Sequence, residues 1–121
     1  MKKIMIVEDE VLIALEMSFH LKDMGYDILQ PVATGEDAVK KAESERPDII
    51  LMDIRLAGKT DGVEAAKAIH LIRKIPIIFM TGYSDDGLIK EIEKLAPLAV
   101  FNKPVDMQRV KSVIDSYFCK A

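Results

Sequence analysis

Short runs of consecutive apolar residues recur along the chain, and a stretch with helical periodicity follows each of them. The clearest runs lie in the predicted strands Lys3 to Val7, where only Lys3 is charged, Ile49 to Met52 and Ile75 to Met80. Runs of this length without polar alternation are typical of strands that are buried on both faces of a sheet. Weaker strand patterns cover Tyr26 to Ala33 and Leu98 to Asn102. The sequence therefore predicts five strands separated by helices.

Five segments have the apolar spacing of amphipathic helices. In the first, about Val11 to Met24, we expect one broad buried stripe that contains Leu12, Leu15 and Phe19 as well as Ala14, Met17 and Leu21. The other helices are expected from Thr34 to Glu45, from Val63 to Lys74, from Asp85 to Leu95 with Ser84 as the cap, and after the cap Asp106.

Strict alternation of strands and helices predicts an α/β fold, a (βα)5 doubly wound parallel sheet with helices on both faces. With five strands, the common strand order is the flavodoxin-like 2-1-3-4-5. Pro31 in the second strand agrees with an edge position, because proline cannot donate to a sheet ladder. This order places the first and third strands side by side.

The composition limits the possible functions. A chain of 121 residues with 50% hydrophobic residues is expected to form a single domain, residues 1–121, with no output domain. The net charge of −3 argues against direct nucleic-acid binding. The single Cys119 allows no internal disulfide. Because no apolar run is long enough for a membrane span or a signal peptide, we expect no membrane contact and a cytoplasmic protein.

Unusual polar residues follow four of the predicted strands. Glu8 and Asp9 follow the first strand, Asp53 the third, Thr81 the fourth and Lys103 the fifth. Taken singly, each has an ordinary explanation, such as an acid in the first turn of a helix or an aspartate that starts a turn. Because the carboxyl ends of parallel strands share one edge of the sheet, we expect all five side chains to converge there.

Three neighbouring carboxylates without a cation would repel one another. Oxygen ligands without histidine or cysteine favour Mg²⁺ over zinc. An aspartate beside Mg²⁺ can attack phosphorus as a nucleophile, while a lysine and a hydroxyl stabilise the phosphoryl oxygens. The pattern thus indicates phosphoryl transfer to Asp53.

At these residues the sequence resembles the receiver domain of two-component response regulators, the CheY-like proteins. The resemblance covers almost the whole chain and rests on a set of spaced motifs: Val7-Glu8-Asp9, Met52-Asp53, Asp61-Gly62, Thr81 and Lys103-Pro104. It implies that Asp53 accepts a phosphoryl group from a phosphohistidine on a histidine kinase or a phosphotransfer protein. It also implies a cis Lys103-Pro104 bond.

The resemblance implies a role for each residue of the site. The expected Mg²⁺ ligands are Asp9, Asp53, the backbone carbonyl of Arg55, and Glu8 through a water molecule. Thr81 and Lys103 become phosphate contacts and switch elements, together with the backbone of Gly82 and Ile54. The domain is then a phosphoacceptor and no enzyme in the usual sense, with only self-catalysed phosphotransfer and autodephosphorylation.

Phosphorylation is expected to alter the face formed by the fourth helix, the fifth strand and the fifth helix. That face would contact an unknown downstream effector, in a monomer or a weak phosphorylation-dependent dimer. The usual aromatic residue on the fifth strand is replaced by Val100. Residues 79–83 resemble the FAT GUY subgroup of receivers, with Met80 in place of its alanine. Tyr83 is the nearest aromatic residue that could move with Thr81, and we expect Tyr83, Arg55 and Phe101 to be the switch or modulating residues.

Three other functions remain open at this point. A flavodoxin-like electron carrier would need a phosphate-binding loop after the first strand, where Glu8 and Asp9 stand instead. An aspartyl phosphatase commonly has a second acid two residues after its nucleophile, where this chain has Arg55. A docking module without phosphorylation would not require the complete set of acids.

Overall fold

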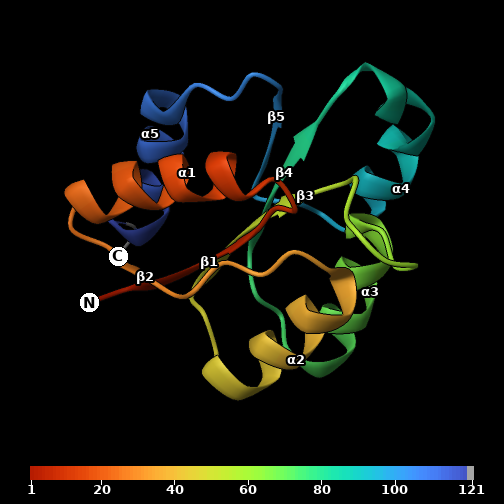
Figure 1. The fold of residues 1–121 in the computed structure, drawn as a ribbon, viewed down its shortest axis with the longest axis horizontal. Coiled ribbons are helices and arrows are strands. Elements are labelled where there is room, and N and C mark those ends of the chain that lie inside the picture. Colours follow the sequence, from red (N-terminus) through yellow and green to blue (C-terminus); the bar gives the residue numbers. More distant parts are fainter. Residues whose placement is uncertain (120–121) are drawn as a thin grey trace.

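A computed structural model describes residues 1–119, and the side chains of Tyr83 and Ser84 lie outside its described part. Five parallel strands form one sheet in the order β2-β1-β3-β4-β5 (Figure 1). The strands are β1 (Lys3–Val7), β2 (Asp27–Ile28), β3 (Ile49–Asp53), β4 (Ile77–Thr81) and β5 (Ala99–Asn102). The predicted fold class and strand order are therefore confirmed.

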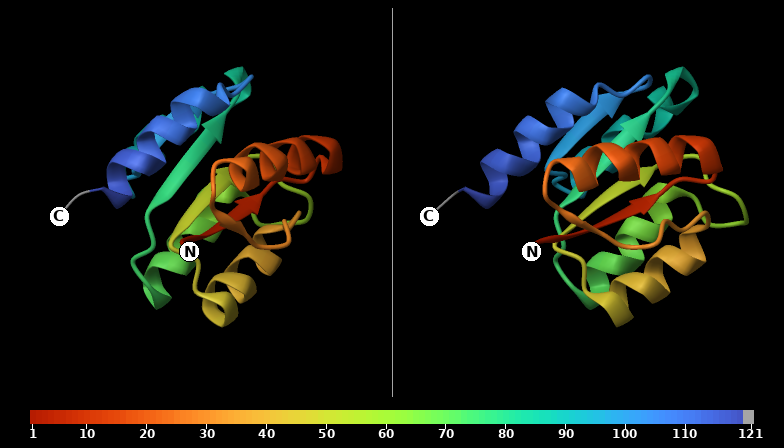
Figure 2. Two further views of the ribbon diagram at one scale, coloured as in Figure 1. Left: turned by 90° about the vertical axis from the view of Figure 1, so that its left-hand side faces the viewer. Right: turned by 60° about the vertical axis from the view of Figure 1, so that its left-hand side comes forward.

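Helices cover both faces of the sheet (Figures 1 and 2). Helices α1 (Val11–Asp23) and α5 (Met107–Phe118) pack on one face. On the other face lie α2 (Gly35–Glu45), α3 (Gly62–Ile72) and α4 (Ile89–Lys94), and a 3₁₀ helix η1 (Tyr83–Leu88) precedes α4. No helix in residues 1–119 is both long and apolar enough to cross a membrane.

The core consists of two clusters, one on each side of the sheet. Successive strand residues point to opposite faces, so Ile4 packs towards α1 and α5 while Met5 packs towards α2 and α3. All residues of β1 except Lys3, and every residue of β3 and β4, are buried. This burial explains why those runs are continuously apolar.

Strand β2 is much shorter than predicted, and Pro31 is the reason. In the observed register Ile4 pairs with Ile28, and the Leu29 N–H donates to the Ile4 carbonyl at 3.0 Å. The next regular donor would be residue 31, but proline has no N–H. The Val32 N–H instead donates to the Ile6 carbonyl at 3.1 Å. The chain is thus one residue longer here than regular pairing requires, and β2 ends early at the predicted sheet edge.

The expected broad stripe on α1 is only half buried. Ala14, Met17 and Leu21 are buried as predicted, whereas Leu12, Leu15 and Phe19 are 81%, 52% and 79% exposed. Each exposed residue precedes a buried one by two positions, which is a rotation of roughly 200° around the helix. The two groups therefore lie on nearly opposite sides of α1, and only one of them can face the sheet.

The segment after β4 also differs from the prediction. We expected one helix from Asp85 to Leu95, but the chain first forms η1 and then α4. The Asp85 N–H donates to the Gly82 carbonyl at 3.1 Å, and the Asp85 carboxylate accepts from the Gly82 N–H at 2.7 Å. This reciprocal pair begins a tight 3₁₀ turn at Gly82, upstream of the expected start. The predicted capping role of the Ser84 side chain lies outside the described part of the chain.

Candidate functional site

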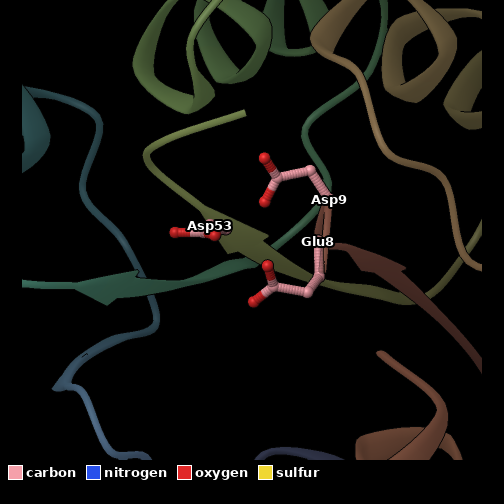
Figure 3. A group of neighbouring side chains, drawn as sticks. All are labelled: Glu8, Asp9 and Asp53. Atoms are coloured by element: carbon pink, nitrogen blue, oxygen red, sulfur yellow. The ribbon is translucent and has the colours of Figure 1, made fainter. Parts of the chain in front are cut away.

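Three carboxylates meet where β1 and β3 end. Glu8 and Asp9 follow β1, Asp53 ends β3, and these two strands are neighbours in the sheet. Figure 3 shows the three side chains projecting to the same side of the strand ends. One carboxylate oxygen from each residue lies within 4.8 Å of the other two. The predicted convergence of acids is therefore present.

The site is partly closed to solvent. Glu8 and Asp53 are 2% and 1% exposed, while Asp9 is exposed. Burial, together with the nearby Asp53 carboxylate, raises the pKa of Glu8 to about 7, against the lowering effects of the Glu10 N–H and Lys103. Bringing two buried carboxylates together is costly unless cations compensate their charge.

Lys103 provides one such cation. Its ammonium nitrogen lies 2.9 Å from Oδ2 of Asp53 and 3.7 Å from Oε1 of Glu8. Burial alone would lower the pKa of Lys103, but the carboxylates of Asp53 and Glu8 outweigh it and raise that pKa. Lys103 is therefore a charged ammonium in contact with Asp53. The Lys103-Pro104 bond that follows is cis, as the resemblance implied.

A divalent cation fits the acidic cluster. Oε1 of Glu8 is buried and has no hydrogen-bond partner among the described residues. The cluster also offers three carboxylates and no histidine or cysteine, which are the donors that suit Mg²⁺. The Arg55 N–H donates to Oδ1 of Asp53 at 3.4 Å, which shows that the Arg55 backbone lies beside the cluster.

Thr81 and Gly82 lie at the same edge of the sheet. With Asp86, Asn102 and Lys103 they line a cavity of about 210 Å³. The Thr81 hydroxyl donates to Oδ1 of Asn102 at 3.0 Å, and Thr81 is 2% exposed. Since Lys103 both lines this cavity and contacts Asp53, the cavity adjoins the acidic cluster.

The backbone groups expected to contact phosphate already have partners. The Gly82 N–H donates to the Asp85 carboxylate at 2.7 Å, and the Ile54 N–H donates to the Met80 carbonyl at 3.4 Å. Either amide must therefore change or share its partner in order to bind a phosphoryl oxygen.

Two residues of the site were missed in the sequence, Asp85 and Asn102. Asp85 is 2% exposed and pairs with Arg55, whose Nε lies 2.8 Å from Oδ1 of Asp85. The three-residue spacing from Gly82 to Asp85 was an available signal, because it is the spacing of a helix cap. Asn102 pairs with Thr81 across β4 and β5, and only the strand register reveals that contact.

The candidate modulating residues lie in different surroundings. The Tyr83 side chain lies outside the described part of the chain. Phe101 packs on the side of the sheet that α1 and α5 cover, and the Arg109 guanidinium lies 5.9 Å from the centre of its ring. Val100 is 41% exposed and pairs in register with Phe79, which is buried on the opposite side.

The loop after Asp53 is fixed by the start of α3. The Asp61 side chain caps this helix by accepting from the Glu64 N–H at 2.8 Å, and the Glu64 side chain accepts from the Asp61 N–H at 3.2 Å. The Gly62 N–H donates to the Ile54 carbonyl at 2.8 Å. A Cβ at residue 62 would lie only 2.1 Å from the Asp53 carbonyl oxygen, so glycine is required there.

Comparison with known proteins identifies the family. The sequence model of the response regulator receiver domain family matches residues 4–115. The chain belongs to this family. It is a receiver domain of two-component systems, and its acidic cluster lies where strands β1 and β3 end. The family match disfavours the alternative of a flavodoxin-like electron carrier.

Two curated relatives are similar over nearly all of this receiver domain. It is 32% identical over 117 residues to sporulation initiation phosphotransferase F of Bacillus subtilis, covering 96% of this chain and 93% of that protein. It is 30% identical over 114 residues to the transcriptional regulatory protein PdtaR of Mycobacterium tuberculosis, covering 94% of this chain. The aligned region spans only 55% of PdtaR, about half of its length.

Solved receiver domains have the same fold. The CheY-like receiver domain protein of Methanospirillum hungatei JF-1 has a TM-score of 0.89 at 26% identity, over 97% of this chain and 93% of that one. The receiver domain of the sensor histidine kinase PA1611 from Pseudomonas aeruginosa PAO1 has a TM-score of 0.86 at 28% identity, over 98% of both chains. The latter structure contains a magnesium ion in its active-site cleft.

Proposed function

We propose that Asp53 is the phosphoacceptor of this receiver domain and that the donor is a phosphohistidine on a histidine kinase or a phosphotransfer protein. One observation carries the proposal: the buried Asp53 carboxylate is 2.9 Å from the Lys103 ammonium and belongs to a cluster with Glu8 and Asp9. Structural ion pairs do not need two additional acids at the same place, whereas phosphoryl transfer to a carboxylate uses all four groups.

In the proposed reaction an oxygen of Asp53 forms a bond to phosphorus while the phosphorus–nitrogen bond of the phosphohistidine breaks. The imidazole leaves with the bonding electron pair and is protonated from solvent. The Lys103 ammonium stabilises the negative charge on the phosphoryl oxygens. The Thr81 hydroxyl and the N–H groups of Gly82 and Ile54 are the proposed further donors to these oxygens.

The proposed cofactor is Mg²⁺, held by Asp9, Asp53, the Arg55 backbone carbonyl and, through water, Glu8. When bound, it would spread the charge that develops on the transferred group. The buried Glu8 oxygen without a hydrogen-bond partner among the described residues supports this assignment. So does the magnesium ion in the related receiver from Pseudomonas aeruginosa.

The proposed output is a change in the face formed by α4, β5 and α5, read by a downstream effector. We propose Tyr83, Arg55 and Phe101 as residues that modulate this change or the loss of the phosphoryl group by self-catalysed hydrolysis. The protein would act in the cytoplasm, as a monomer or as a weak dimer that forms on phosphorylation. No other enzymatic activity is proposed.

Incubation with Mg²⁺ and acetyl phosphate, followed by intact-mass spectrometry, tests the proposal. We expect a single added phosphoryl group on the wild-type chain, and none on Asp53→Asn or when EDTA replaces Mg²⁺. The amide of the variant fills nearly the same volume but is not a nucleophile, so the variant should remain folded. Uptake by Asp53→Asn at the wild-type rate would assign the phosphoryl group to another residue.

A further inference from the structure

Asp85 is a buried acid that phosphoryl transfer, as proposed above, does not use. It is 2% exposed although it lies in the short connection between β4 and α4. Both of its oxygens are occupied: Oδ1 accepts from Nε of Arg55 at 2.8 Å, and Oδ2 accepts from the Gly82 N–H at 2.7 Å. These are short, charge-assisted contacts to two cationic or polar donors.

The two residues that Asp85 engages both lie at the proposed phosphoryl-transfer site. Gly82 lines the cavity that Thr81 and Lys103 also line. Arg55 follows Asp53 by two residues, and its backbone N–H donates to Oδ1 of Asp53 at 3.4 Å. A backbone N–H and a guanidinium are groups that bind phosphoryl oxygens as well as carboxylates. Asp85 thus occupies an N–H group and a guanidinium that belong to two residues of this site and that are able to bind a phosphoryl group.

We propose that Asp85 is a positioning residue that holds Gly82 and Arg55 in the unphosphorylated protein, and that a phosphoryl group on Asp53 displaces its carboxylate from both. The proposal rests on the assignment of Asp53 as the phosphoacceptor. Two anions cannot share one N–H donor without repelling each other, and the phosphoryl group brings the larger charge.

The displacement would reach the surface through η1. The Gly82 N–H and carbonyl are both bonded to Asp85, so these contacts fix the first turn of η1. Loss of the carboxylate contact frees that turn to move with Gly82. Since η1 leads directly into α4, the change at Asp53 acquires a route to the proposed output face.

Three variants separate this role from general electrostatics and from helix capping. Asp85→Ala removes both contacts, and Asp85→Asn removes the charge that attracts Arg55 while keeping an oxygen that Gly82 can reach. Glu93→Gln is the control, because it removes one negative charge from an exposed side chain on α4, outside the cavity and the acidic cluster. Thermal melting first establishes that each variant is folded, and Asp85→Asn carries the test if Asp85→Ala is not.

The first measurement is the initial rate of phosphoryl uptake from acetyl phosphate with Mg²⁺, followed by intact mass. We expect Asp85→Ala to react at least about fivefold faster than wild type, given the usual strength of a charge-assisted hydrogen bond, with Asp85→Asn between the two. Glu93→Gln should stay within about twofold, as expected for an exposed charge. If Asp85 only capped η1, its variants would melt earlier without reacting faster.

The second measurement is the amide resonance of Gly82 with and without beryllofluoride, a phosphoryl mimic. Without it, Asp85→Ala and wild type should differ at Gly82, because only wild type has the carboxylate acceptor. With it, their Gly82 resonances should coincide. If wild type takes up phosphoryl groups but the Gly82 resonances of wild type and Asp85→Ala differ equally with and without beryllofluoride, the proposed role of Asp85 is wrong. The assignment of Asp53 would then still stand. Absence of wild-type uptake would overturn the assignment of Asp53 and this inference with it.

Discussion

The ammonium nitrogen of Lys103 lies 2.9 Å from Oδ2 of Asp53, a residue that is only 1% exposed. The contact joins the end of β5 to the end of β3 across the intervening strand β4. Among the described residues, Lys103 is the only lysine or arginine that forms an ion pair with Asp53 or Glu8.

Replacing Lys103 by methionine should therefore destabilise the metal-free protein by about 2 kcal/mol, because it leaves the buried Asp53 charge uncompensated. The cost is below that of breaking a fully buried pair because the Lys103 side chain is 32% exposed. The measurement is urea unfolding in EDTA. Saturating Mg²⁺ should stabilise the variant more than it stabilises wild type, since the metal replaces the lost cation. Lys40→Met, at an exposed position on α2, is the control. Equal unfolding free energies of the Lys103 variant and wild type in EDTA would contradict this account.

A second prediction concerns the pH dependence of stability in EDTA. The pKa of Glu8 rises from an ordinary value of 4.5 to about 7 in the folded protein, mainly by burial. Between these two values the folded state holds a proton that the unfolded state has lost, so stability falls as the pH rises. Above about pH 7 the ionised Glu8 costs on the order of 3 kcal/mol, because the pKa rises by about 2.5 units and one unit corresponds to about 1.4 kcal/mol.

Glu8→Gln should remove this cost. We expect the variant and wild type to have similar unfolding free energies near pH 4.5 and the variant to be the more stable one at pH 8. Chemical denaturation at both pH values is the measurement. A stability difference that stays constant between them would show that Glu8 does not titrate in this range. Addition of Mg²⁺ should stabilise wild type more than the variant, which has lost one carboxylate.

Part of the site edge of the sheet could be predicted because Glu8, Asp53 and Thr81 each stand at the end of a buried apolar run. The runs before Glu8, Asp53 and Thr81 are continuously apolar, so their ends are visible in the sequence. The strand order then follows from the alternation of strands and helices. Neither the ends of these strands nor their order depends on knowing how the side chains pack.

Two features could not be predicted from the sequence. One is the side of α1 that faces the sheet, and the other is the contact of Asp85 with a distant residue. Helix α1 is apolar on both sides, and periodicity alone cannot decide whether Leu12 or Ala14 faces the sheet. Asp85 looked like an ordinary residue of a helical first turn. Its partner Arg55 is 30 residues away in the sequence, and only the fold brings the two together.

A third prediction tests how tightly α3 begins against Asp53. A Cβ at residue 62 would lie 2.1 Å from the Asp53 carbonyl oxygen, whereas one at Gly87 would meet nothing within 4 Å. Gly62→Ala should therefore destabilise the protein by about 3 kcal/mol, the upper end of overpacking costs. Gly87→Ala, the matched control, should change stability by less than about 1 kcal/mol.

Thermal or urea unfolding of the two alanine variants gives the comparison. Because the shift at residue 62 acts on the backbone of Asp53, the folded fraction of Gly62→Ala should also take up phosphoryl groups more slowly. If both variants unfolded at the same urea concentration, the close approach of α3 to Asp53 would not exist in solution.

The last prediction concerns the hydroxyl of Thr81. It donates to Oδ1 of Asn102 at 3.0 Å, between two residues that pair directly in register across β4 and β5. To contact a phosphoryl group on Asp53, the hydroxyl must leave this acceptor. Asn102 itself is exposed, so its replacement by alanine should change the unfolding free energy by less than about 1 kcal/mol.

Asn102→Ala removes the acceptor and should strengthen the binding of beryllofluoride by about threefold, since one net hydrogen bond no longer has to be exchanged. Asn102→Asp should have the opposite effect: a carboxylate is a stronger acceptor for Thr81 and adds a negative charge next to Lys103. Titration by amide spectra measures both affinities under the same Mg²⁺ concentration. One variant removes the acceptor for Thr81 and the other makes it stronger, so a loss of affinity in both would indicate local distortion. Unchanged affinity in both would mean that the contact with Asn102 does not restrain Thr81.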